Sequence, residues 1–499
     1  MKQIRTLFGL EAELRSEVFR PDGKRHADAL DALEASCFEG LPHLVGEERG
    51  VFLASGGNWY REAAGGYTHQ EFSTPECTTP SEAVLHMQAG YLFARRGADR
   101  FVQQHGGRAC FSRNNVCYSA GTSWGNHECH CMQNNPETCA DALFSHLATR
   151  NIYAGSGGFA PRSAGLEFVL SSRAPFIGAV TSGSTEGPSR ALFHKDYKSP
   201  RGHGGWYRAH LIVGDGLCSE RSLWLRTATT ALIVALADYN RKPEAAAQVA
   251  EPLAALHTIN ADPSLKAAVP CKDGKLRTAI DIQRELLLAH VERHVEILPL
   301  WAPEAVTEWR RVLDDLANHG LGGLARSHDA AIKWDLYTDL LAQRGFSWDD
   351  VSGKTGRATG AGKADVKRLR AEMMLLDTRF PELSENGLFE ILDSQPALLD
   401  HRVPRVKERI EWAIENPPPD TRAAARGAIV KQFYGTQDAG NVRVGWSFGV
   451  ELSSGKKIDL SNPFNPHPSG LDEFLQRRDF AKAASEPHAR RTFRDLIGF

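Results

Sequence analysis

Two glutamates near the start of the chain, Glu11 and Glu13, lie two residues apart in the segment LFGLEAEL. In an extended strand both side chains point to one face, while Leu10, Ala12 and Leu14 point to the other. Two neighbouring carboxylates repel each other unless water or a cation lies between them. Mg²⁺ binds a few carboxylate oxygens and leaves the rest of its shell to water and phosphates. The pair therefore indicates either a magnesium site or a solvated strand face, and alternation alone does not decide between them.

A second group of possible ligands lies in the segment NWYREAAGGYTHQEFSTPEC. It comprises Tyr60, Glu62, His69, Glu71 and Glu76. If this segment is extended, His69 and Glu71 share one face. Such a density of oxygen and nitrogen donors is compatible with a metal site, although a polar surface strand explains it nearly as well.

A third group lies in SAGTSWGNHECHC, residues 119–131. In a strand, Glu128 and His130 face one way, and His127, Cys129 and Cys131 face the other. The crowding suggests zinc, but structural zinc ligands are usually paired as C-x-x-C or H-x-x-x-H, and neither spacing occurs here. A cysteine–histidine hydrolase is disfavoured because no local signature surrounds any cysteine.

Two further segments could contact phosphate. In YRAHLIVGD, Arg208 and His210 share one face of a predicted strand, and a fixed guanidinium suits a phosphate oxygen. The segment GKTGRATGAGK, residues 353–363, is not a P-loop. The spacing G-x-x-x-x-G-K-(S/T) requires glycine where Arg357 lies and serine or threonine where Ala364 lies. This segment is predicted to be a basic loop.

The elements that must position these residues are predicted from hydrophobic spacing. Strand patterns cover Leu7–Leu14, Cys110–Phe111, Ser123–Met132 and Ala209–Val213. Helical patterns cover Ser81–Phe101 (with Ser81 as N-cap), Ser222–Tyr239, Ala279–Leu298, Pro303–Asn318 and Val366–Leu376.

The C-terminal part is predicted to form a separate small domain. The segment Asn416–Asp420 contains three consecutive prolines, which is typical of a linker. The tail Val442–Leu460 is predicted to form a strand pair with its turn at residues 453–455. We therefore expect two domains, residues 1–415 and residues 416–499.

The composition narrows the function classes. The chain has 499 residues, 42% of them hydrophobic and 24% charged, and a formal net charge of −2. This near-zero net charge does not indicate binding to nucleic acid or to a membrane surface. The most apolar stretch, Thr227–Ala237, is too short to cross a bilayer and is predicted to be a buried helix. The chain's beginning shows no signal peptide, and nine cysteines suit a reduced compartment, so we expect a cytoplasmic protein.

These segments, in order, resemble motifs of the family of Pup ligases and depupylases, where Pup is the prokaryotic ubiquitin-like protein. LFGLEAEL is similar to the family's opening G-x-E-x-E strand, and NWYREAAGGYTHQEFSTPEC to its segment with a tyrosine, a catalytic aspartate and H-P-E-Y-(A/S)-T-x-E-C. RNNVCYSAGTSWGNHE resembles K-N-N-T-D-S-x-G-x-S-(Y/F)-G-x-H-E, and YRAHLIVGDGLCSE resembles R-L-H-V-I-x-G-D-x-N-x-x-E. AIDIQRE, PPPDTRAAARG and Asn462-Pro463-Phe464 follow in family order, so the resemblance spans nearly the whole chain.

The resemblance implies an α+β fold related to glutamine synthetase and γ-glutamyl–cysteine ligase. A curved antiparallel sheet would form an open cradle packed on helices, with residues 1–415 as the catalytic carboxylate–amine-ligase-like domain and a small C-terminal domain. ATP would lie in the cradle with Mg²⁺ ions held by Glu11, Glu13, Tyr60, Glu71, His127 and His210. Implied contacts to phosphate or nucleotide are Arg208, Arg422 and Arg426. Glu62 would take the place of the catalytic aspartate.

The chain also departs from the family motifs. Glu62 is one methylene longer than aspartate, and a misplacement near 1 Å can cost about 10²-fold in rate. Three extra residues lie between Glu62 and His69, and the stretch Val116–Tyr118 has no counterpart of the family's N-N-T-D aspartate. Leu217 and Cys129 stand where the family has asparagines. These departures leave the metal and ATP residues in place and change the acceptor side, so we expect a substrate other than Pup.

Three functional hypotheses follow. The first is a Mg-ATP-dependent carboxylate–amine ligase or amidase that activates a carboxylate as an acyl phosphate, with a peptide or a small carboxylate as its partner. The second is a phosphotransferase or ATPase that moves the γ-phosphate to a small acceptor such as a nucleotide, or to water. The third is a catalytically inactive binding protein, which the six intact ligand positions disfavour.

Overall fold

The structure, a computed structural model, describes residues 3–46, 50–64, 67–161, 163–185, 187–195, 205–244, 248–353 and 363–476. The chain forms two compact units. The first unit comprises Met1–Thr6, Arg113–Pro200 and Arg208–Val403, and the second comprises Leu7–Ser112, Arg201–Tyr207 and Pro404–Phe499. The predicted boundary between residues 415 and 416 stays a prediction. Most of the predicted basic loop, residues 354–362, lies outside the described residues.

The second unit is built on an antiparallel sheet in the order β1-β5-β4-β3-β2. Its strands are β1 (Phe8–Phe19), β2 (His43–Val45), β3 (Gly50–Leu53), β4 (Asn58–Ala64) and β5 (Tyr67–Ser73). A further strand, β6 (Arg108–Ser112), pairs with the later half of β1. Along β1 buried residues alternate strictly with half-buried ones, as the sequence pattern predicts.

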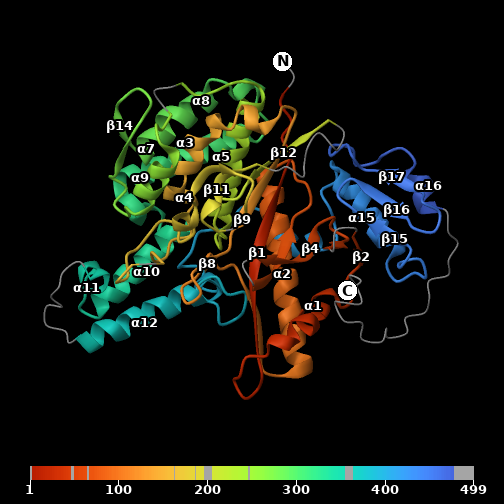
Figure 1. Ribbon diagram of the computed structural model, residues 1–499, viewed down its shortest axis with the longest axis horizontal. Helices are drawn as coiled ribbons and strands as arrows, with labels where there is room; N and C mark the ends of the chain where they lie inside the picture. Colours follow the sequence, from red (N-terminus) through yellow and green to blue (C-terminus); the bar gives the residue numbers. More distant parts are fainter. Residues whose placement is uncertain are drawn as a thin grey trace. The chain divides into compact units, whose positions relative to one another are not determined.

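The apolar face of this sheet packs on the helices α1 (Leu30–Phe38) and α2 (Pro80–His105), and Figure 1 shows α2 running alongside β1. Trp59 is fully buried, with its ring centroid 5.2 Å from that of Phe93 on α2. The N-cap of α2 is Thr79, whose side chain accepts from the Glu82 amide at 3.2 Å. The predicted cap, Ser81, is therefore wrong, because Pro80 occupies the first helical position and shifts the cap before it.

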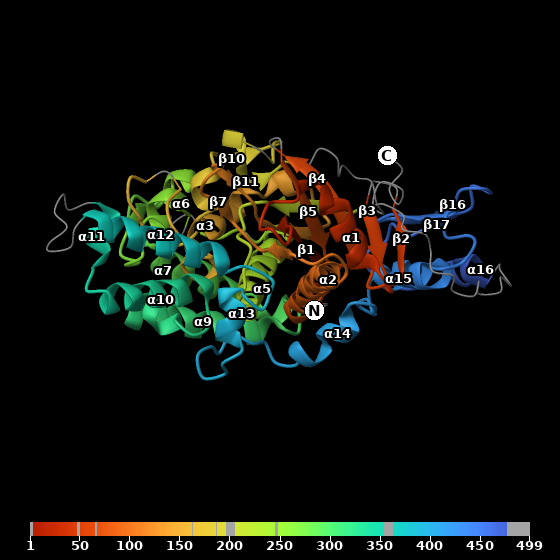
Figure 2. The ribbon, with the colours of Figure 1, turned by 90° about the horizontal axis from the view of Figure 1, so that it is seen from below.

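The C-terminal segment of the second unit forms a small sheet on a helix (Figure 2). Its elements are α15 (Arg422–Phe433), β15 (Val442–Val444), β16 (Phe448–Glu451), β17 (Lys457–Asp459) and α16 (Leu471–Gln476). The predicted turn at residues 453–455 lies between β16 and β17. The predicted strand pair is wrong, because a third strand, β15, pairs with β16. A tight turn joins these two strands, in which the Gly445 amide donates to the Phe448 carbonyl at 2.8 Å.

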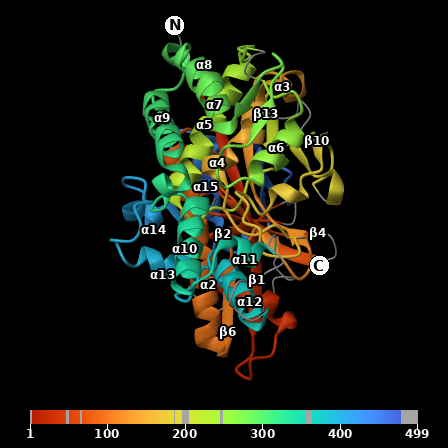
Figure 3. The ribbon, with the colours of Figure 1, turned by 90° about the vertical axis from the view of Figure 1, so that its left-hand side faces the viewer.

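In the first unit, four strands of one sheet follow the order β10-β11-β12-β9. They are β9 (Asn126–Met132), β10 (Ala179–Ser182), β11 (Ala191–His194) and β12 (Tyr207–Leu211), and β11 pairs antiparallel with β12. The helices of this unit, several of which Figure 3 labels, include α3 (Asp141–Thr149), α5 (Glu220–Asp238), α9 (Ala302–His319), α10 (Asp329–Gln343) and α12 (Lys363–Arg379).

Helix α5 contains the stretch Thr227–Ala237, which is buried throughout, as predicted. The helix predicted over Ala279–Leu298 is divided into α7 (Ala279–Ile282), a π-helical segment (Gln283–Leu288), α8 (Ala289–Glu292) and a 3-10 turn (Val295–Ile297). Among the described residues, no helix is both long and apolar enough to cross a bilayer. The predicted α+β class, a mostly antiparallel sheet packed on helices with a small C-terminal sheet, is confirmed.

Candidate functional site

An acidic group occupies one face of the sheet in the second unit. Strand pairing places Glu71 on β5 directly opposite Glu13 on β1 and directly opposite Tyr60 on β4. Glu62 on β4 is opposite His69 on β5. We use the name acidic group for six residues: Glu11, Glu13, Tyr60, Glu62, His69 and Glu71. Their alternation along three neighbouring strands brings all six to the same face.

The donor atoms of the acidic group lie close enough to share a cation. Ligand atoms of Glu13, Glu62, His69 and Glu71 all lie within 4.8 Å of one another, and those of Glu11 and Glu71 are equally close. The Nε2 atom of His69 is 3.8 Å from a carboxylate oxygen of Glu13 and 3.8 Å from one of Glu62. Most of these donors are oxygens, which is the ligand type that Mg²⁺ prefers.

The electrostatics of the acidic group favour a bound cation. Glu71 is 1% exposed, and its burial raises its pKa well above the usual value, with the charges of Glu11, Glu13 and Glu62 adding to the effect. Burial also raises the pKa of Tyr60, and the neighbouring carboxylates of Glu71 and Glu11 raise it further. A cation here would offset both the desolvation and the repulsion, so these residues fit Mg²⁺.

The opposite face of the same strands fixes the acidic group in place. Arg61, which follows Tyr60 on β4, donates to Glu34 at 3.2 Å and to Asp31 at 2.8 Å, both on α1. Glu34 is fully buried. These contacts tie β4 to the helix, and they hold the alternate residues Tyr60 and Glu62 of that strand on the other face.

The two C-terminal arginines bind a carboxylate of the second unit. Arg422 Nε donates to Glu76 at 2.6 Å, and Arg426 forms an ion pair with the same carboxylate. Arg426 is fully buried, donates to the carbonyls of Gly56 at 2.9 Å and Trp446 at 3.1 Å, and lies over the Trp446 ring. Burial alone would raise the pKa of Glu76, but the two guanidinium charges outweigh it and lower the pKa to about 2. Arg422 keeps 13% side-chain exposure.

A row of histidines crosses the strands of the first unit. His194 on β11 is directly opposite His210 on β12, with their Nδ1 atoms 3.2 Å apart. The ring of His127 on β9 lies 5.2 Å from that of His210, and Arg173 donates to His127 Nε2 at 3.4 Å. Arg208 lies 3.7 Å from the Cys129 sulfur.

The other face of β9 is packed into the interior of the first unit. Glu128 is fully buried and lies 2.6 Å from Arg150 and 3.8 Å from Arg226. Burial alone would raise the pKa of Glu128, but these two cations lower it. Burial lowers the pKa of His130 to about 4, so this histidine is a neutral core residue at pH 7. The predicted division of the strand into two faces is confirmed.

Comparison with known proteins identifies the family. The sequence profile described as Pup-ligase protein matches residues 12–448. The chain belongs to this family. Among the Pup-ligase family relatives, the Pup--protein ligase of Acidimicrobium ferrooxidans is 28% identical over 86% of this chain and 90% of its own length. The Pup deamidase/depupylase of Mycolicibacterium smegmatis is 27% identical over 77% of this chain and 72% of its own length.

Solved structures show that the fold is that of the Pup ligase. The ligase PafA in complex with Pup has a TM-score of 0.75 at 22% identity, over 94% of this chain and 92% of that chain. PafA in complex with ADP has a TM-score of 0.70 at 22% identity, over 86% of this chain and 89% of that chain. The Pup-ligase fold therefore accounts for nearly all of the chain.

In this Pup-ligase family member, the structure groups the predicted residues within each unit. The second unit brings together Glu11, Glu13, Tyr60, Glu62 and Glu71, and the first unit brings His127 close to His210. Their roles as ligands and the catalytic role of Glu62 stay predictions, as do the nucleotide contacts of Arg208, Arg422 and Arg426. The sequence pattern places His69 only beside Glu71 on one strand face, and the strand pairing puts it between Glu13 and Glu62.

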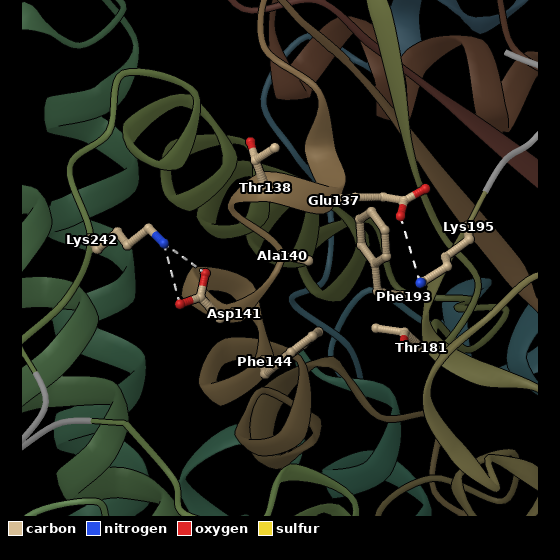
Figure 4. Close-up of a pocket in the computed structure, with 9 residues that line it drawn as sticks. All are labelled: Glu137, Thr138, Ala140, Asp141, Phe144, Thr181, Phe193, Lys195 and Lys242. Atoms are coloured by element: carbon tan, nitrogen blue, oxygen red, sulfur yellow. Dashed lines mark hydrogen bonds and ion pairs between the residues drawn. The ribbon is translucent and has the colours of Figure 1, made fainter. Parts of the chain in front are cut away.

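The first unit also contains a cavity of about 360 Å³, shown in Figure 4. Phe144 and Phe193 line it, with an ion pair at each side, Lys195 to Glu137 at 3.6 Å and Lys242 to Asp141 at 3.0 Å. The lining residues that the structure describes include none of the predicted site residues. Phe193 precedes His194 on β11, so the cavity and the histidine row lie on opposite faces of that strand.

Proposed function

We propose that this Pup-ligase family member uses ATP and Mg²⁺ to activate a carboxylate as an acyl phosphate, in a ligase or amidase reaction. Family membership and relatives named as a Pup--protein ligase and a Pup deamidase/depupylase support this proposal. The observation that carries it is the acidic group, where a buried carboxylate lies within 4.8 Å of three further ligand residues.

The acidic group would hold Mg²⁺ through Glu11, Glu13, Tyr60 and Glu71, with His69 at its edge. When bound, ATP supplies the phosphoryl group, and the Mg²⁺ ion neutralises the charge that develops on it. Tyr60 lies directly opposite Glu71 in the pairing of β4 with β5, so the two side chains are placed to share one ion. The assignment of His127 and His210 to the same ions stays a prediction.

Glu62 is suited to contact the acceptor. Its side chain is 48% exposed, in contrast to the buried Glu71, and one of its oxygens lies 3.8 Å from His69 Nε2. A carboxylate in this position can orient the acceptor carboxylate or take a proton from an attacking amine or water.

The three arginines would have different parts in nucleotide binding. Arg208 is half-buried and Arg422 keeps some side-chain exposure, so both can reach a phosphate oxygen. Arg426 donates to protein acceptors and is fully buried, so we assign it the positioning of Glu76 and Arg422.

The substrate would be a peptide or a small carboxylate other than Pup. The replacements at Glu62, Cys129 and Leu217 fall on residues that the family resemblance places on the acceptor side. Since an aspartate-to-glutamate change moves a carboxylate by about one methylene, an altered acceptor is the simplest way to retain productive geometry.

The test follows the fate of the γ-phosphate. Purified protein is incubated with Mg²⁺ and γ-labelled ATP, with and without candidate carboxylates and amines. Label released as phosphate only when a carboxylate and an amine (or an amide substrate) are present supports the proposal. Label transferred to a nucleotide, or released without any carboxylate, would instead indicate the phosphotransferase or ATPase. Absence of turnover under every condition would indicate a binding protein.

A further inference from the structure

A buried arginine, Arg173, contacts one of the histidines that the family resemblance assigns to magnesium. Arg173 and His127 both belong to the first unit. The Arg173 side chain is 1% exposed, and its guanidinium donates to the Ile212 carbonyl through Nε at 3.1 Å and Nη2 at 2.8 Å, and to the Ser123 hydroxyl through Nη1 at 3.2 Å. The same Nη2 lies 3.4 Å from Nε2 of His127. Acceptors other than His127 therefore fix the guanidinium in place.

The chain leaves room for this guanidinium at Gly125, two residues before His127. A Cβ atom at Gly125 would lie 2.5 Å from the central carbon of the Arg173 guanidinium. Because the hydrogen bonds to Ile212 and Ser123 hold that group, a larger residue at position 125 would push it away from His127. The contact between Arg173 and His127 thus depends on a glycine in the same segment.

The guanidinium determines which ring nitrogen of His127 carries a proton. Arginine has five N–H donors and no acceptor, and it stays charged throughout the pH range of folded proteins. Nε2 of His127 must therefore accept this hydrogen bond with its lone pair, and the proton of the neutral ring lies on Nδ1. A doubly protonated ring would instead direct an N–H group at the Arg173 cation.

This form of the ring does not suit a metal ligand. A histidine that binds a metal through one nitrogen normally donates its other N–H to a carboxylate, a carbonyl or water. If Nδ1 of His127 bound Mg²⁺, the proton would lie on Nε2 and point at the Arg173 guanidinium, in a site where His127 is 4% exposed. Binding through Nε2 would place the ion against the same cation. Mg²⁺ also prefers oxygen ligands.

We propose that Arg173 is a positioning residue that holds His127 in the Nδ1–H form, and that His127 donates to a phosphate oxygen of the nucleotide and does not bind Mg²⁺. The phosphate contact rests on the proposed function, because the family resemblance places His127 beside both the ions and ATP. Hydrogen bonds to charged oxygens are the strong ones, so an N–H donor suits this place. The acidic group keeps its role in holding Mg²⁺.

The first test is NMR of the unmodified full chain with ¹⁵N-labelled histidine, without nucleotide, at about pH 8, above the ordinary histidine pKa of about 6.5. The protonated and unprotonated nitrogens of a neutral ring have clearly different shifts. We expect the proton on Nδ1 of His127. The matched control is His401 in the same unit, whose Nδ1 accepts from the Glu220 amide at 3.4 Å and whose Nε2 lies 2.7 Å from Asp393, so its proton should lie on Nε2. His127→Gln and His401→Gln assign the signals.

A proton on Nε2 of His127, or conversion of its signals to a metal-bound form on addition of Mg²⁺, would overturn the proposal. Arg173→Lys keeps a cationic donor and should retain the Nδ1–H form, whereas Arg173→Met should give a mixture of both forms. An unchanged spectrum in Arg173→Met that is folded by circular dichroism would show that Arg173 does not set the proton position. If that variant does not fold, the spectrum of the unmodified chain still decides.

The second test separates hydrogen-bond donation from metal ligation. His127→Asn keeps an N–H donor near the place of Nδ1, and His127→Ala removes it. We expect both variants to bind Mn²⁺, used in place of Mg²⁺ and followed by electron paramagnetic resonance without nucleotide, as the unmodified chain does, while Glu71→Gln loses affinity. A non-hydrolysable ATP analogue should bind about 10-fold or more weakly to His127→Ala and nearly normally to His127→Asn.

Weaker Mn²⁺ binding in His127→Ala would return His127 to the metal ligands and overturn the proposal. Equal affinity of His127→Ala and the unmodified chain for the ATP analogue would overturn the phosphate contact. A chain that binds no nucleotide at all would contradict the proposed function, whereas the NMR result on Arg173 and His127 would still stand because it needs no nucleotide.

Discussion

At the scale of single residues, the metal-site interpretation depends most directly on Glu71. It lies opposite both Glu13 and Tyr60, and burial together with neighbouring carboxylates raises its pKa. The raised pKa favours the protonated carboxyl when no cation is present, and a bound cation favours the charged ligand. Replacing Glu71 with glutamine, which has nearly the same shape but cannot become charged, should show whether the charged carboxylate is needed.

We expect Glu71→Gln to reduce Mg²⁺-dependent ATP turnover by about 10²-fold or more, because the amide cannot supply a charged ligand. The free energy of unfolding, measured in urea without metal, should change little because the amide has nearly the same shape as the carboxyl and adds no charge to the acidic group. Glu17→Gln, on the same strand but outside the acidic group, is the control and should leave turnover unchanged. Full turnover in Glu71→Gln would refute the metal assignment.

A second residue-scale prediction concerns Glu62, whose side chain is half exposed beside His69. Glu62→Gln should leave nucleotide affinity near that of the unmodified protein and abolish the chemical step, since the amide cannot accept a proton. Calorimetry with a non-hydrolysable ATP analogue and single-turnover kinetics measure the two effects separately. Loss of nucleotide binding would place Glu62 among the metal ligands instead.

Which residues share a face could be predicted from the sequence, and which residues meet across strands could not. Alternation correctly places Glu11 with Glu13, and His69 with Glu71, because the side-chain period of a strand is local. The contact of His69 with Glu13, and of His194 with His210, depends on strand pairing over tens of residues. Nothing in the local sequence specifies that register.

At the scale of elements, the sheet of the second unit depends on close packing against α2. A Cβ atom at Gly90 would lie 2.2 Å from the Phe72 ring, which is itself buried in the core. The sequence predicted this helix but not its cap, since Thr79 and Ser81 are both chemically able to cap and only the position of Pro80 distinguishes them.

We expect Gly90→Ala to lower the free energy of unfolding by about 1–3 kcal/mol, because the Phe72 ring must move within a packed core. The control is Gly440→Ala, in the same unit, where an added Cβ has no atom within 4 Å. Urea unfolding of both variants measures the difference. Equal stability of the two variants would show that α2 does not pack on β5 as described.

The ion pairs of Glu76 connect α15 to the segment after β5. Glu76→Gln should destabilise the protein by about 3–5 kcal/mol at pH 7, because it leaves the buried Arg426 without its charge partner. Glu473→Gln, which disrupts an exposed pair with Lys456, should cost less than about 1 kcal/mol. Urea unfolding at pH 7 measures both.

The Glu76 contribution should also depend on pH in a defined direction. Because its folded pKa is lowered to about 2, its stabilisation is complete above the unfolded pKa of about 4.3 and is lost as the pH falls toward 2. The difference in stability between the unmodified protein and Glu76→Gln should therefore shrink between about pH 5 and pH 2. A difference that stays constant over this range would contradict the ion-pair assignment.

At the scale of the whole molecule, the family profile covers residues 12–448, and the fold likeness covers 94% of the chain. The ordered motifs made this membership predictable, since motif order survives when individual residues change. The acceptor substrate could not be predicted in the same way. The replaced residues argue against Pup as the substrate, but they do not indicate which substrate takes its place. A cytoplasmic location stays a prediction.

The central claim is that a carboxylate is activated as an acyl phosphate, and hydroxylamine trapping tests it most directly. Protein, Mg²⁺, ATP and a panel of carboxylates are incubated with hydroxylamine, and hydroxamate and ADP are measured together. We predict equal amounts of hydroxamate and ADP with a matching carboxylate, and neither product after chelation of Mg²⁺ or in Glu71→Gln. ADP formation that requires no carboxylate and gives no hydroxamate would contradict the account.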